Sequence, residues 1–140
     1  MVIDTQRDLD LAALTRRIRR HIVQMVYDAK SGHIGGSLSA VEIITVLYAR
    51  IMRHDPQRPD WPERDRFILS KGHACPVLYA TLAEQGYLPV EELTTFRALN
   101  SRLQGHPRVG TIPGVRKMET FINLASKKEQ MGINMETVTV

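Results

Sequence analysis

Apolar residues recur at spacings of three and four near the start of the chain, with polar residues between them. The apolar series consists of Leu11, Leu14, Ile18, Ile22, Met25, Val26 and Ala29. This period is typical of an amphipathic α-helix, which packs one face on a core and turns the other to water. The pattern predicts a helix over residues 8–29.

A second, more uniformly apolar stretch predicts another helix, over residues 40–52. Ser39 stands three residues before Glu42, the spacing of a capping box, in which two side chains satisfy free backbone N–H groups at a helix start. Because few polar positions interrupt this stretch, we expect it to be buried on several sides. The glycine-rich residues 32–36 predict a loop between the two helices.

The middle of the chain combines a charged, proline-rich segment with two apolar segments that follow it. Prolines and charges dominate residues 53–65, "RHDPQRPDWPERD", and predict a loop. The short apolar run at 67–70 predicts a buried strand, and a helix is expected past Pro76, since proline is tolerated in a first helical turn. A strand, a turn and a helix in this order favour an α/β fold, and a further helix is predicted over residues 89–99.

Composition narrows the functional classes. The chain has 140 residues, of which 43% are hydrophobic and 24% charged, values typical of one globular domain. No apolar run approaches the roughly 18 residues that cross a bilayer, and the first residues do not resemble a signal peptide, so we expect a cytoplasmic protein without a membrane partner. The single cysteine, Cys75, excludes an internal disulfide.

The formal net charge of +4 raises the possibility of a nucleic-acid partner. Four arginines cluster at residues 16–20, but the rest of the chain mixes both signs and lacks the alternating aromatic residues that stack on bases. Charged helix faces ordinarily face water, which disfavours nucleic-acid binding.

Three Gly-His pairs are the main chemical signal. They are Gly32-His33, Gly72-His73 and Gly105-His106. Chance would pair five histidines with nine preceding glycines about 0.3 times in a chain of 140 residues. Each pair lies in a predicted loop or at a helix entrance, where binding groups concentrate.

Three interpretations of these pairs stay open. Each pair, taken singly, fits an exposed surface turn. A zinc site is possible in principle, but the local His-x-x-x-His or Cys-x-x-Cys spacing is missing. The third interpretation is a site for an anionic, hydroxyl-rich ligand, because imidazoles donate to phosphate and sugar oxygens and His73 stands at a helix entrance.

In three stretches that include these pairs, the chain resembles the N-terminal section of transketolases, most closely the form split into two subunits. The resemblance rests on "AKSGHIGGSLSAVEIITVLYARIMRHDP", "WPERDRFILSKGHACPVLYATLAEQGYL" and "LQGHPRVGTIPGV". It implies an α/β fold, the N-terminal part of a thiamine-diphosphate-binding fold, helix-rich and with its parallel sheet left incomplete. A partial domain is expected over residues 1–115, followed by a divergent tail over residues 116–140.

The resemblance implies an enzyme that moves a two-carbon ketol unit between sugar phosphates with thiamine diphosphate and Mg²⁺. His33 would then orient substrate hydroxyls, His73 would lie against the cofactor diphosphate and the substrate, and His106 would reach the reacting hydroxyl or carbonyl. The cofactor-binding residues that it implies are His73, Ser70, Gly72 and Gly105.

The resemblance ends at "TIPGV". The family continues there into a glycine-rich turn and later supplies a Gly-Asp-Gly motif and an asparagine that hold the divalent ion, whereas this chain reads "RKMETFINLASKKEQMGINMETVTV". We therefore expect a truncated chain that holds no metal and is inactive alone. A weak helix ending at Gly132 and an exposed strand in "ETVTV" are predicted for the tail, which is either a genuine or a frameshifted end.

A half-built parallel sheet would leave a strand edge and apolar helix faces uncovered. We therefore expect association, either with a transketolase C-terminal subunit or with further copies of the chain. The alternative is a non-catalytic remnant or docking module that binds a transketolase subunit.

Overall fold

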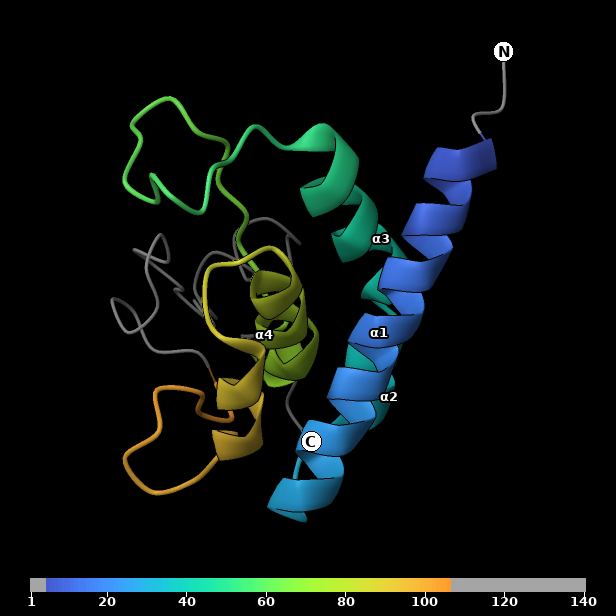
Figure 1. Ribbon diagram of the computed structural model, residues 1–140. Helices are drawn as coiled ribbons and strands as arrows, with labels where there is room; N and C mark the ends of the chain where they lie inside the picture. Colours follow the sequence, from blue (N-terminus) through green and yellow to red (C-terminus); the bar gives the residue numbers. More distant parts are fainter. Residues whose placement is uncertain (1–4, 107–140) are drawn as a thin grey trace, which may run out of the picture.

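The structure is a computed structural model that describes residues 5–106 (Figure 1). The predicted tail helix and strand, and the whole segment 116–140, lie outside the described residues. The first helix, α1 (Thr5–Ala29), runs along one side of the described part, and three shorter helices pack against it. These are α2 (Ile34–Leu38), α3 (Val41–Val46) and α4 (Cys75–Glu84).

The predicted first helix is confirmed, and it begins a few residues earlier than expected. Its face made of Ile18, Ile22 and Met25 is buried, and Leu14 and Val26 pack partly against the same core. The three-and-four spacing of the apolar residues therefore identified the buried face correctly.

The second predicted helix is also present but differs in its details. α3 continues without a break into the π-helix η1 (Leu47–Ile51). Its outer face is not buried as expected, because Ile43 is 65% and Ile51 63% exposed. Among the described residues this helical segment has one buried face, which includes Val41 and Ile44.

The predicted capping box is wrong. The Ser39 hydroxyl donates to the Gly36 carbonyl at 3.1 Å, at the end of α2, and it does not cap α3. Glu42 instead accepts from Arg19 Nη2 at 2.5 Å, because α1 passes beside it. Glu42 is therefore engaged in a tertiary ion pair and Ser39 in the preceding helix. Neither interaction can be recognised from the local sequence.

The glycine-rich segment forms a short helix, α2, where a loop was predicted. Ser37 in this helix is fully buried, and its hydroxyl donates to the His33 carbonyl at 3.3 Å. Burial against the rest of the protein thus overcomes the low helix propensity of Gly35 and Gly36.

The strand predicted at 67–70 is wrong: the described residues 5–106 contain helices, turns and irregular backbone but no strand. Leu69 is buried and Phe67 packs partly on the core, so these apolar side chains hold the segment against the core. A strand also needs a neighbour that accepts its backbone hydrogen bonds, and none lies within these residues. They therefore show the helix-rich part of the expected architecture and not its sheet.

α4 is the central helix, and every residue from Cys75 to Ala83 in it is buried. The 3₁₀-helix η2 (Gly72–Ala74) leads into it, and Pro76 lies in its first turn as predicted. The loop predicted over 53–65 is confirmed.

The last predicted helix, over 89–99, is shorter and tighter than expected. It is the 3₁₀-helix η3 (Val90–Thr95). It cannot continue because the Arg97 N–H donates to the Leu103 carbonyl at 2.8 Å, across the following turn. No helix among the described residues is long and apolar enough to cross a membrane.

A candidate ligand site at the Gly-His pairs

The structure brings His33 and His73 together. His33 immediately precedes α2, and His73 lies in η2 at the entrance to α4. Their ring centroids are 5.2 Å apart with an interplanar angle of 76°, an edge-to-face contact, and both residues are exposed. Two Gly-His pairs from distant parts of the sequence therefore present their imidazoles on one accessible face.

Gly36 lets α2 approach this pair closely. A Cβ at Gly36 would lie 3.3 Å from Lys71 Cε and 3.4 Å from His73 Nε2, which is tighter than ordinary van der Waals contact. The space of the missing side chain is thus bordered by an ammonium-bearing chain and an imidazole.

Gly32, before His33, is required for two reasons. Its φ is +145°, a conformation that side chains with a Cβ rarely adopt, and a Cβ would lie 3.1 Å from Val26 Cγ2. Gly32 therefore sets the direction in which the chain leaves α1, and with it the position of His33 directly before α2.

The third pair is attached to α4 through its backbone. The Cys75 thiol donates to the Gly105 carbonyl at 2.9 Å, and the Tyr79 hydroxyl donates to the Gln104 carbonyl at 2.8 Å. Since Cys75 lies two residues after His73, the segment carrying the exposed His106 is fastened next to the second pair.

Burial keeps both donors protonated. It raises the pKa of the Cys75 thiol to about 12 and raises the pKa of the Tyr79 phenol as well. A thiol with so high a pKa carries its proton at neutral pH and can donate it to a carbonyl. This anchoring role was not predicted from the sequence, although the i, i+4 spacing of the two residues on one helix was a usable signal.

Ser70 and Gly72 form the turn that opens α4. The Gly72 N–H donates to the Ser70 carbonyl at 3.0 Å, and Gly72 is buried whereas Ser70 is exposed. Lys71 between them is exposed and was not singled out from the sequence. Its position in "SKGH", directly before a Gly-His pair, was the available signal.

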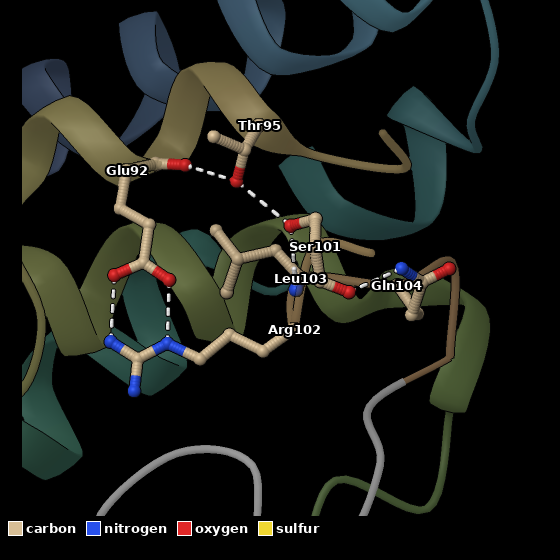
Figure 2. Close-up of polar contacts among 6 residues, drawn as sticks. All are labelled: Glu92, Thr95, Ser101, Arg102, Leu103 and Gln104. Carbon is tan, nitrogen blue, oxygen red and sulfur yellow. Dashed lines mark hydrogen bonds and ion pairs between the residues drawn. The ribbon is translucent and has the colours of Figure 1, made fainter. Parts of the chain in front are cut away.

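The loop that leads to His106 is held by its own polar contacts (Figure 2). Arg102 donates to both carboxylate oxygens of Glu92, at 2.5 and 2.6 Å, and the interaction holds the pKa of the Glu92 carboxyl below its usual value. Thr95 and Ser101 share a hydroxyl–hydroxyl hydrogen bond of 2.8 Å. These contacts join η3 to the segment that follows it and so fix the path of the chain toward the third pair.

The described residues, 5–106, contain no group of three or more His, Cys, Asp or Glu side chains placed to hold a metal ion. The zinc interpretation therefore finds no support in this part of the chain. What the site offers is imidazole and ammonium donors beside the first turn of α4, where helix N–H groups give a partial positive charge. That combination suits a phosphorylated, hydroxyl-rich ligand.

Comparison with known proteins gives consistent matches. The family model described as "Transketolase, thiamine diphosphate binding domain" matches residues 11–120. Transketolase 2 of Xanthobacter flavus is 47% identical over 103 residues, and transketolase 1 of Escherichia coli is 45% identical over 103 residues. These matches cover 73% of this chain, which spans 15% and 16% of the length of the two relatives.

A solved structure shares the fold. The transketolase of Pichia stipitis in complex with sedoheptulose 7-phosphate superposes with a TM-score of 0.70 and 41% sequence identity. The superposition covers 76% of this chain and 16% of that structure.

Proposed function

The chain belongs to the transketolase family, in its thiamine diphosphate binding domain, and from this premise we propose that the three Gly-His pairs form part of a site for thiamine diphosphate and a sugar phosphate. The observation that carries the proposal is the contact between the His33 and His73 rings on an exposed face, within the residues that the family model matches. The reaction would be transfer of a two-carbon ketol unit between sugar phosphates.

The donor chemistry of the site fits the cofactor. A diphosphate is anionic, and the side chains around the space left by Gly36 are an imidazole and an ammonium. Thiamine diphosphate, when bound, supplies the electron sink needed to break a carbon–carbon bond beside a carbonyl.

The protein's own residues would bind, orient and exchange protons. Lys71 and His73 would donate to diphosphate oxygens, with Ser70, Gly72 and Gly105 beside them. His33 and His106 would donate to, or accept from, substrate hydroxyl and carbonyl oxygens, a task for which neutral imidazole has both a donor and an acceptor.

Mg²⁺, when bound, would neutralise part of the charge of the diphosphate. Residues 5–106 hold no group of side chains suited to a metal ion, so we propose that its protein ligands come from outside this range. We also propose that the site is completed by another chain, either a transketolase C-terminal subunit or a second copy, and that the protein acts in the cytoplasm. A remnant that only docks on a transketolase subunit is the alternative.

A chimera tests the proposal. Residues 11–106 replace the matching segment of Escherichia coli transketolase 1, and ketol transfer is assayed with thiamine diphosphate and Mg²⁺. We expect activity, a loss of roughly 100-fold in kcat/KM for His106→Ala, and a raised KM for the sugar phosphate with His33→Ala.

His21→Gln is the matched control for the chimera. His21 bonds Glu84 at 2.9 Å and lies outside the Gly-His pairs. An active chimera in which His33→Ala and His106→Ala behave like His21→Gln would contradict the proposal.

A further inference from the structure

Arg97 lies between two of the three Gly-His segments. It follows η3 in a left-handed backbone conformation, with φ of +62°. Its side chain extends to the segment before the first pair, where Nη1 donates to the Ser31 hydroxyl at 2.5 Å. Ser31 is two residues from His33, so this hydrogen bond joins the end of η3 to the start of the first histidine segment.

The same guanidinium lies against Gly105. A Cβ at Gly105 would stand 2.7 Å from Arg97 Nη2, 2.8 Å from Nε and 3.0 Å from Cζ, and the first two are distances that real Cβ atoms essentially never show. Gly105 is not among the described residues with a positive φ, so its backbone does not demand glycine. A side chain at position 105 would therefore have to displace the Arg97 guanidinium.

We propose that Arg97 is a positioning residue that couples the His33 and His106 segments to one another. The Cys75 thiol already fastens the Gly105 carbonyl beside His73. With Arg97 added, the first pair is connected to the third and the third to the second, and the three imidazoles share one framework. Their use in ligand binding rests on the proposed function, whereas the coupling itself does not.

Arginine has the shape for this role. Its planar fork can place one terminal nitrogen on the Ser31 hydroxyl while the other and Nε stay along the Gly105 backbone. A lysine has one nitrogen at the end of a flexible chain and can satisfy only one of these contacts. We therefore expect Arg97→Lys not to restore the coupling.

The test uses the full chain without cofactor and reads the imidazole resonances by NMR. In Gly105→Ala the new methyl displaces the guanidinium from Ser31, so the ring signals of His33 shift although its segment is remote in sequence. In the Arg97→Ala background the same substitution meets empty space, and its effect on His33 is largely lost. This non-additivity is the signature of coupling through Arg97, and a general loss of stability does not produce it.

Two further variants serve as a second test of the coupling and as a control for changes elsewhere in the loop. Ser31→Ala removes only an exposed hydroxyl, a kind of substitution that ordinarily changes stability little, and it is expected to abolish the effect of Gly105→Ala on His33 as well. Arg102→Ala, in the same loop, removes the ion pair with Glu92 and is expected to leave the His33 signals in place.

The inference is overturned when Gly105→Ala leaves His33 unmoved, or when its effect on His33 is undiminished in the Arg97→Ala chain. Arg102→Ala shifting His33 as much as Arg97→Ala also overturns it. The chimera with Escherichia coli transketolase 1 reports separately on the proposed function: if its His33→Ala and His106→Ala variants behave like His21→Gln, that proposal fails, while the cofactor-free coupling keeps its own outcome.

Discussion

At the scale of single residues, the glycines of the site are required for different physical reasons. Gly32 adopts a backbone conformation that few other residues reach, Gly36 gives room to Lys71 and His73, and Gly105 gives room to Arg97. The sequence predicted that the Gly-His pairs lie in loops or at helix entrances, where binding groups concentrate. It could not predict which side chain fills each space, because those neighbours come from other segments.

Gly36→Ala tests the close approach behind His73. We expect the His73 ring signals to shift, since the new methyl would stand in contact with the ring, 3.4 Å from Nε2, and 3.3 Å from Lys71 Cε beside it. Gly35→Ala is the control in the same helix, where a Cβ meets nothing within 4 Å. It should raise the free energy of unfolding by about 0.5–1 kcal/mol through helix propensity and leave His73 unmoved.

NMR spectra and urea unfolding of the two variants give the answer. Equal effects of the Gly35 and Gly36 substitutions on His73 would show that the imidazole does not depend on the space at Gly36.

At the scale of elements, local patterns identified the helices and failed where partners are remote. The buried face of α1 follows from the spacing of its apolar residues, and the place of Pro76 in the first turn of α4 follows from backbone chemistry. Both features could therefore be predicted from the local sequence. The strand at 67–70 and the capping box at Ser39 failed because strand pairing and the Arg19–Glu42 ion pair depend on segments far away in the chain. The contact of His33 with His73 was unpredictable from residues alone for the same reason.

The first turn of α4 should make the protein sensitive to alkali. The Cys75 thiol has a pKa of about 12 when folded, against 9.0 as its ordinary value. Between these values the unfolded thiol loses its proton while the folded one keeps it, so deprotonation stabilises the unfolded chain. This contribution to stability is complete below about pH 9 and is lost progressively as the pH rises toward 12.

Urea unfolding at pH 7 and pH 10 measures this effect. The unaltered chain should lose more stability over that interval than Cys75→Ser, whose hydroxyl does not ionise there. An equal loss in both chains would place the alkaline sensitivity elsewhere, for instance at Tyr79, whose pKa burial also raises.

At the scale of the whole molecule, the described part is a helical scaffold that positions one face. α1, α3 and α4 bury a common core, and the Gly-His pairs lie at the ends of elements around it. The family assignment and the helix-rich architecture could be anticipated from three sequence stretches. The anchoring contacts of Cys75, Tyr79 and Arg97 could not be anticipated, because each contact connects groups that meet only in the folded chain.

The central claim is that three separate Gly-His pairs serve one ligand site. It is tested most directly by titrating the full chain with thiamine diphosphate and Mg²⁺ while recording the imidazole resonances. The account predicts that His33, His73 and His106 shift with one common Kd, whereas His21, bonded to Glu84, and His54, bonded to Tyr87, stay in place. Separate Kd values for the three site histidines, or equal shifts of all five histidines, would contradict it.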